Sequence, residues 1–202
     1  MCFAVSFKNV VFCLFCLYLI LPAHPVIFLS VMSDAFSLNR DVLVFLGKLL
    51  GYFGVWYVIY ELWVLPEGSL DAWLSVNIVA VTGGLLSASG FDLFLEGRVL
   101  GLVGTSGVII INGCNGLEAI GLFVGFVMAY PGDRLKRALF LPMGILAIYL
   151  VNIARVAVLV LLQYYYPASF DFAHDYSTSA IFYLAIFGLW VIWINYGSRH
   201  QT

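Results

Sequence analysis

Three residues in this chain have side chains suited to acyl-transfer chemistry, and each lies in an unusual setting. Cys114 lies in the run 113–116 (GCNG), where a β-like segment gives way to an apolar run. Arg155 lies near the middle of another apolar run, and His174 lies in a polar stretch before the last one. A thiol nucleophile, a histidine that moves protons and a fixed cation form a minimal set for acyl transfer.

The setting of Cys114 favours a reactive thiol. The sequence predicts a helix that begins here, and a helix N-terminus offers N–H groups and the positive end of the helix dipole. Both features favour a thiolate over a thiol, as does a nearby arginine. Asn115 and Gly116 follow Cys114 directly. The alternative is a small buried hydrophobic residue, which is the usual role of a lone cysteine.

Arg155 is a functional candidate because an ionisable group within a membrane span is costly. Asn152 lies three residues earlier and gives this predicted helix a polar face. Glu118 follows Cys114 by four residues, on the same face of its predicted helix, and could orient or neutralise Arg155. The alternative is a structural arginine paired with Glu118 or with backbone carbonyls. A loop histidine such as His174 is, in turn, often merely solvated.

The elements that must position these residues are membrane helices. Hydrophobic residues make up 63% of the 202 residues and charged residues only 10%, against about 25% charged in a soluble domain. The apolar runs are long enough to cross a bilayer, where helices satisfy their own backbone hydrogen bonds. We predict an all-α membrane protein, a single domain over residues 1–202 with about six transmembrane helices at 10–32, 42–65, 70–89, 114–130, 135–163 and 179–196.

One stretch does not resemble a membrane helix. Residues 91–112 contain four glycines, two acids and one arginine. Two short aliphatic runs, Val99–Val103 and Val108–Ile111, flank the sequence GTSG at 104–107, which is typical of a hairpin turn. The sequence therefore predicts a short extracytoplasmic β-hairpin-like segment before the fourth helix.

Basic residues predict the orientation in the cell (inner or cytoplasmic) membrane. Arg134, Lys136 and Arg137 lie together between the fourth and fifth spans, which places that connection in the cytoplasm. With six spans, both termini are then cytoplasmic, and the hairpin, Cys114 and the polar loop 168–178 lie outside. Arg40 falls on the outer side in this arrangement, against the rule.

These residues together resemble the exosortase/archaeosortase family of multi-spanning membrane enzymes. The resemblance rests on the run 113–117 (GCNGL) opening a span, the run 152–155 (NIAR) in the next one, and His174 before the last. It covers residues 91–196. The Cys-Asn-Gly sequence departs from the Cys-Ser-Gly that is more frequent in the family, and no glycine follows His174 until Gly188.

The resemblance implies a cysteine-type transpeptidase or protease that acts on exported proteins. Their C-terminal sorting signal would consist of a short motif, a hydrophobic span and a basic tail, and the product would pass to an amine acceptor at the outer face. By this resemblance Cys114 is the nucleophile, His174 moves protons, and Arg155 stabilises the thiolate or the oxyanion. No cofactor or metal is implied, and the partners are the substrate protein and the lipid bilayer.

The composition and motifs also bear on other functions. No basic patch with interleaved aromatic residues is present, so the chain is not expected to bind nucleic acid. The HExxH sequence of metalloproteases is absent, and the GTSG letters of a rhomboid-like site fall in the predicted hairpin rather than in a span. A non-enzymatic membrane component, such as a transporter or export-system subunit, is the alternative, and it would use Glu61, Glu118 and Arg155 as pathway charges.

Overall fold

The structure, a computed structural model, describes residues 40–197, which are mostly helical. The described part begins with a long helical stretch made of α3 (Arg40–Ile59), a π-helical turn (Tyr60–Val64) and α4 (Leu65–Glu67). The elements that follow are α5 (Ser69–Ala88), β1 (Leu93–Glu96), β2 (Val99–Leu102), β3 (Val108–Ile109), α6 (Leu117–Ala129), α7 (Arg134–Tyr165), a 3-10 turn (Pro167–Ser169), α8 (Phe170–Ile192) and a final π-helical turn (Trp193–Gly197).

Four of these helical stretches are long and apolar enough to cross a membrane: Arg40–Glu67, Ser69–Ala88, Arg134–Tyr165 and Ala180–Gly197. The apolar helix α6 is shorter, with 13 residues. This supports a helical membrane protein, while the predicted span 10–32 lies outside the described residues. The predicted polar loop at 168–178 is wrong, because α8 already begins at Phe170 rather than at residue 179.

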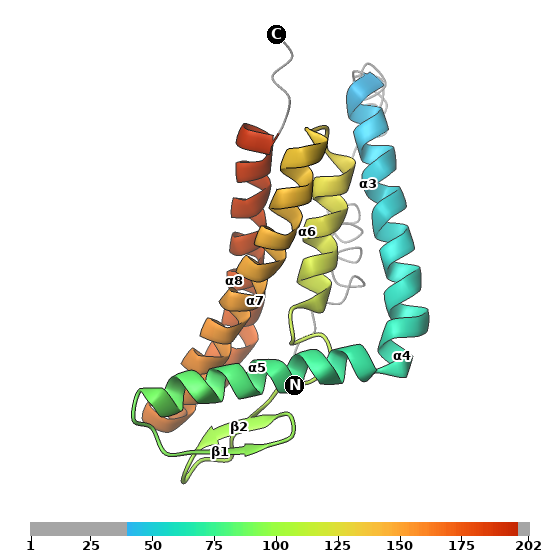
Figure 1. The fold of residues 1–202 in the computed structure, drawn as a ribbon. Helices are drawn as coiled ribbons and strands as arrows, with labels where there is room; N and C mark the ends of the chain where they lie inside the picture. The colour runs from blue at the N-terminus through green and yellow to red at the C-terminus, as the bar shows by residue number, and fades with distance from the viewer. Residues whose placement is uncertain (1–39, 198–202) are drawn as a thin grey trace, which may run out of the picture.

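Helix α5 runs across the ends of α6, α7 and α8 instead of alongside them (Figure 1). Its buried face carries the polar residues Asp71, Ser75 and Thr82, all with 0% exposure. Its outer face carries large apolar side chains, with Trp73 63% exposed and Leu85 56% exposed. A helix in water has the reverse arrangement, so the exposed face of α5 suits contact with lipid.

Helices α3 and α6 are antiparallel, because the chain does not change ends along α5. Phe45, near the start of α3, packs against Phe126 and Tyr130 near the end of α6, with ring centroids 5.7 and 5.5 Å away. Six alternating spans would make these two helices parallel. The structure therefore puts the start of α3 at the same end of the bundle as the α6–α7 connection (Figure 1), and the predicted opposition of Arg40 to the basic cluster is wrong.

Two glycines let α6 approach α3 closely. Gly121 and Gly125 form a small-xxx-small pattern on α6, and a Cβ at either position would collide with Trp56 or Phe53 of α3. Small residues at this spacing allow close packing between membrane helices, where dispersion rather than the hydrophobic effect holds helices together. This contact fixes the position of α6, and with it the segment that carries Cys114.

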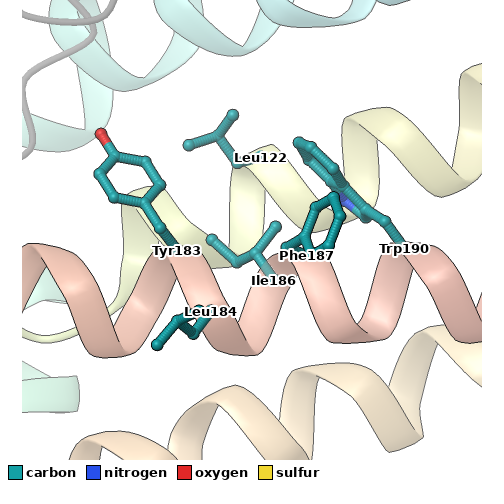
Figure 2. Close-up of a pocket in the computed structure, with 6 residues that line it drawn as sticks. All are labelled: Leu122, Tyr183, Leu184, Ile186, Phe187 and Trp190. Carbon is teal, nitrogen blue, oxygen red and sulfur yellow. The ribbon is translucent and has the colours of Figure 1, made fainter.

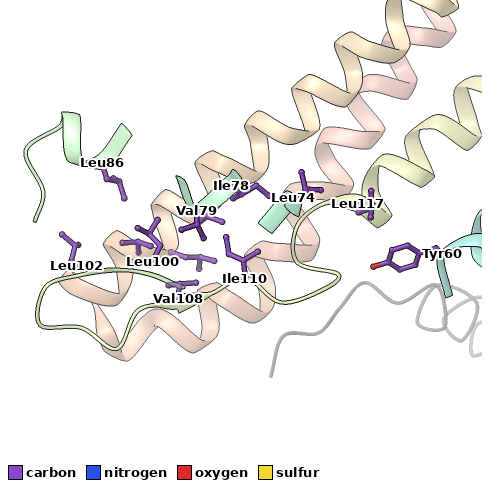
Figure 3. Close-up of a cluster of buried hydrophobic side chains, with 13 residues drawn as sticks. Tyr60, Leu74, Ile78, Val79, Leu86, Leu100, Leu102, Val108, Ile110 and Leu117 are labelled. Atoms are coloured by element: carbon purple, nitrogen blue, oxygen red, sulfur yellow. The ribbon is translucent and has the colours of Figure 1, made fainter. Parts of the chain in front are cut away.

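The predicted hairpin is present as β2 and β3, which pair antiparallel with Val99 opposite Ile109. A third strand, β1, was not predicted and pairs with β2, with Glu96 opposite Val99. The small sheet packs under α5 and α7 and forms a buried apolar cluster with them (Figure 3). The cluster comprises Tyr60, Leu74, Ile78, Val79, Leu86, Leu100, Leu102, Val108, Ile110, Leu117, Val156, Leu159 and Val160.

A second buried cluster holds α6, α7 and α8 together at the other end of the bundle. It is rich in aromatic residues: Phe126 stacks on Trp190 at 4.4 Å between ring centroids, and Phe140 stacks on Trp193 at 5.3 Å. The candidate chemical residues lie between these two clusters, where the three helices meet α5 and the sheet.

Candidate active site

Cys114 lies in a turn that precedes α6 rather than within the helix itself. Gly113 and Gly116 both have positive φ, +80° and +85°, a conformation that residues other than glycine rarely adopt. Gly116 is the N-cap residue and the helix begins at Leu117, so the predicted helix start at residue 114 is three residues early. The Cys114 side chain is 3% exposed.

Two buried side chains of α7 converge on the backbone of Cys114. The Arg155 guanidinium donates from Nη1 to the Cys114 carbonyl oxygen at 3.1 Å. The Asn152 side-chain amide donates from Nδ2 to the same oxygen at 3.3 Å. Arg155 Nη1 also donates to Asn152 Oδ1 at 3.2 Å, so the three residues form one network.

The structure shows partners of Arg155 that the sequence left open. The prediction had the guanidinium facing the thiolate or the oxyanion, and the alternative had it paired with Glu118 or with backbone carbonyls. One of its hydrogen bonds goes to a backbone carbonyl, that of Cys114 itself. Arg155 is 4% exposed and its guanidinium carbon lies 5.8 Å from the centre of the Phe182 ring. A desolvated cation over an aromatic ring is a favourable contact.

His174 lies in the first turns of α8, at the end of the bundle where the Cys114 turn lies (Figure 1). On the same helix, Phe182 packs next to both Arg155 and Gly116. Eight residues separate His174 from Phe182, which corresponds to about 12 Å along a helix. His174 thus belongs to a helix that contacts the site, and its role in proton transfer stays a prediction.

Asp71 is a buried residue of this site that the sequence analysis missed. It lies in the first turn of α5 and is 0% exposed. Its Oδ1 accepts a hydrogen bond of 2.6 Å from Asn115 Nδ2, and the Tyr60 hydroxyl donates to the same oxygen at 3.5 Å. The signal was available, because an aspartate opens a predicted span of apolar residues at 70–89.

The two acids that the sequence analysis noted within spans belong to the electrostatic surroundings of Tyr60 and Asp71. Glu61 and Glu118 act electrostatically on Tyr60 together with Asp71, and Glu118 also senses both other carboxyl groups. The Cys114 turn is therefore in contact with Arg155 of α7, and its neighbour Asn115 is in contact with Asp71 of α5. Within residues 40–197, no group of three or more metal-ligating side chains is placed to hold a metal ion.

The sulfur of Cys114 takes part in a disulfide in the structure. The other cysteines of the chain, Cys2, Cys13 and Cys16, lie outside the described residues. Nucleophilic chemistry requires the reduced thiol, so activity at Cys114 has to be measured with a reductant present.

An apolar groove lies further along α6 and α8, away from the Cys114 turn. It has a volume of about 340 Å³ and is lined by Leu122, Tyr183, Leu184, Ile186, Phe187 and Trp190. Five of the six come from α8 and one from α6 (Figure 2). The groove offers no nucleophile or charged side chain, which leaves the buried network around Cys114 as the candidate active site.

Comparison with known proteins identifies a family for most of the chain. Residues 5–191 match the family model described as transmembrane exosortase (Exosortase_EpsH). Searches of curated proteins and of solved structures found no match to the chain. The family match includes Cys114, Arg155 and His174. The chain belongs to the transmembrane exosortase family.

Proposed function

We propose that this protein is a membrane-embedded cysteine transpeptidase or protease that cleaves the C-terminal sorting signals of exported proteins. Membership of the exosortase family supports this class of activity and this class of substrate. Cys114 is the proposed nucleophile, His174 the group that moves protons, and Arg155 the cation that holds the nucleophile in place. Asn115, Gly116, Glu118 and Asn152 are the supporting residues.

The observation that carries the proposal is the convergence of Arg155 and Asn152 on the carbonyl of Cys114. Burying a guanidinium is costly unless it is paired and hydrogen-bonded. Because Arg155 and Asn152 both direct a buried donor at this oxygen, we expect them to hold the turn rigidly. A nucleophile fixed within a fraction of an ångström of its attack position gains much of its rate from orientation. A rigid turn with a thiol, held from two helices, meets that requirement.

The proposed reaction has two steps. The Cys114 thiolate attacks the scissile carbonyl, the C–N bond breaks, and the leaving amine takes a proton from His174. The resulting thioester joins the substrate to Cys114. An acceptor amine then attacks the thioester and the C–S bond breaks, with the proton of the amine returning to His174 and the thiolate restored. Backbone N–H groups of Asn115 and Gly116 are the proposed donors to the oxyanion in both steps.

The proposed orientation places Cys114 on the extracytoplasmic side. The start of α3 and the start of α7 lie at one end of the bundle (Figure 1), so Arg40, Arg134, Lys136 and Arg137 all belong to that end. Basic residues concentrate on the cytoplasmic side of membrane proteins. The antiparallel packing of α3 and α6 thus removes the exception that Arg40 made, and it strengthens the assignment of the opposite end to the outside.

The proposal is tested with purified protein, a reductant and a peptide that carries a sorting signal. Cys114→Ala should abolish cleavage while the variant remains folded. With the acceptor amine withheld, the wild-type protein should gain the mass of the acyl fragment at Cys114. Cleavage at the normal rate by Cys114→Ala would show that the cysteine mechanism is wrong.

A further inference from the structure

Asp71 joins α5 to the segment that carries the nucleophile, across 44 positions of the chain. Its Oδ1 accepts from Asn115 Nδ2 at 2.6 Å, and its backbone oxygen lies 3.4 Å from the same nitrogen. Asn115 is the immediate neighbour of Cys114 and is 1% exposed. A hydrogen bond to a carboxylate is shorter and roughly twice as strong as one between neutral groups.

Asn115 uses its two polar atoms to connect α5 to the start of α6. Its Nδ2 donates to Asp71, while its Oδ1 accepts from the backbone N–H of Leu117 at 3.1 Å. The second contact satisfies one of the N–H groups that open every helix. Because both ends of the amide are engaged, the side chain has one orientation, and the backbone at 114–116 is fixed relative to α5.

The Cys114 turn is therefore held from two sides. Arg155 and Asn152 of α7 hold its carbonyl oxygen, and Asp71 of α5 holds the next residue through its side chain. Two anchors on neighbouring residues restrict rotation of the turn, which one anchor alone would permit. The direction of the Cys114 Sγ depends on that rotation.

An ordinary structural role does not account for the burial of Asp71. An aspartate in the first turn of a helix stabilises the helix dipole while exposed to solvent, yet Asp71 is 0% exposed and makes no cap hydrogen bond. Its Oδ2 is buried and accepts no hydrogen bond from residues 40–197. A carboxyl group held this way costs stability, and buried ionisable groups of membrane proteins are functional by default.

We propose that Asp71 is a positioning residue for the reaction at Cys114, acting through the side chain of Asn115. This inference rests on the proposed function. It assigns Asp71 no contact with substrate. Loss of the contact should lower the rate of thioester formation and leave substrate binding nearly unchanged, because the sulfur is displaced while the rest of the site remains.

The test measures kcat and KM for peptide cleavage, per amount of folded protein, in four variants. Asp71→Ala should lower kcat by about tenfold or more with little change in KM, since small misplacements of a reacting group are costly. Asn115→Asp should be similarly slow, because it opposes two carboxyl groups. The double variant Asp71→Asn with Asn115→Asp should recover most of that loss, because the amide and the carboxylate exchange places and the oxygen that accepts from Leu117 is kept.

The fourth variant is the matched control, Ser75→Ala, one helical turn further along α5. Ser75 is also 0% exposed, and its hydroxyl accepts a hydrogen bond from Arg98 rather than contacting the Cys114 turn. It should keep the wild-type kcat. If Ser75→Ala slows the reaction as much as Asp71→Ala does, the effect comes from the packing of α5 and the inference is wrong.

Two further outcomes would also overturn the proposed role of Asp71. One is a wild-type kcat in Asp71→Ala; the other is a double variant no faster than Asn115→Asp alone. The comparison of the double variant with Asn115→Asp tests the role of Asp71 even if Asp71→Ala fails to fold. Either result, found together with an inactive Cys114→Ala, would leave the cysteine mechanism standing and remove only the role of Asp71.

Discussion

Arg155 donates a hydrogen bond of 3.1 Å to the carbonyl oxygen of Cys114, although 41 positions separate the two residues. The contact joins the middle of α7 to the turn before α6. Arg155 Nη1 also donates to Asn152 Oδ1 at 3.2 Å, so the guanidinium joins two neighbouring groups of the network. Arg155 holds the backbone of the residue that carries the thiol. The planar arrangement of its guanidinium N–H donors is therefore as important as its charge.

Arg155→Lys should insert and fold but lose most of its activity. Lysine keeps the charge, but its compact ammonium lacks the planar fork of donors that can reach both Cys114 O and Asn152 Oδ1. We expect a fall in kcat of about a hundredfold, comparable to misplacing a reacting group by 1 Å. Peptide cleavage assays, normalised to folded protein by size-exclusion chromatography, measure this effect.

Arg137→Lys is the matched control for that substitution. Arg137 donates to the Tyr130 carbonyl oxygen at 3.0 Å and lies over the Trp193 ring, at the opposite end of the bundle. It has the same kind of contacts as Arg155, so it reports the general effect of an Arg-to-Lys change in this fold. Full activity in Arg155→Lys would reduce Arg155 to a point charge.

Replacing Asn152 separates the two donors to the Cys114 carbonyl. Asn152→Leu keeps the volume but removes both the donor to Cys114 O and the acceptor for Arg155. Removing one partner of a buried hydrogen bond costs about 1–3 kcal/mol, so both a lower midpoint of thermal unfolding and a lower kcat are expected. A variant with unchanged stability and rate would show that Arg155 alone holds the turn.

His174→Ala should slow both formation and breakdown of the thioester. General acid–base groups contribute about 10²- to 10⁴-fold to a rate, and we expect a loss in that range. Asp175→Asn, at the neighbouring position of α8, is the control for changes to this helix. Rates measured by mass spectrometry of the acyl-enzyme would contradict the assignment if the two variants were equally active.

Cysteine labelling tests the arrangement in which α5 lies across the bundle end. In a chain without its native cysteines, single cysteines are introduced at Glu67, Ser169 and Leu135. An impermeant reagent should label the first two from outside, and Leu135→Cys only after permeabilisation. Labelling of Glu67→Cys on the same side as Leu135→Cys would show that α5 crosses the membrane, as six alternating spans require.

Gly121→Ala should destabilise the contact between α3 and α6. The added methyl group collides with the Trp56 ring, and overpacking of this kind costs about 1–3 kcal/mol. Gly84→Ala is the control, because a Cβ there meets nothing within 4 Å; it should be neutral or stabilise its helix by about 0.5–1 kcal/mol. Thermal unfolding in detergent compares the two, and equal midpoints would contradict the packing argument.

The sequence by itself determined the membrane class and most helix positions, and it singled out the candidate site residues. Long apolar runs can satisfy their backbone only as helices in lipid, so the helical stretch Arg40–Glu67 and the helices α5 and α7 were predicted to within two residues at each end. Glycines on both sides of Cys114 marked the turn, because few other arrangements need two such residues three positions apart. An arginine in an apolar run marked Arg155 for the same energetic reason.

Only the tertiary structure decided which partners these residues have and how the helices are arranged. Hydropathy indicates that a helix is apolar enough to leave water. It does not distinguish a helix that lies across the end of a bundle from one that spans the membrane. The direction of α5, the antiparallel packing of α3 and α6, and the contact of Asp71 with Asn115 all depend on contacts between residues far apart in the chain. Such contacts are set by how side chains fit together in space, which the spacing of residues along one chain does not specify.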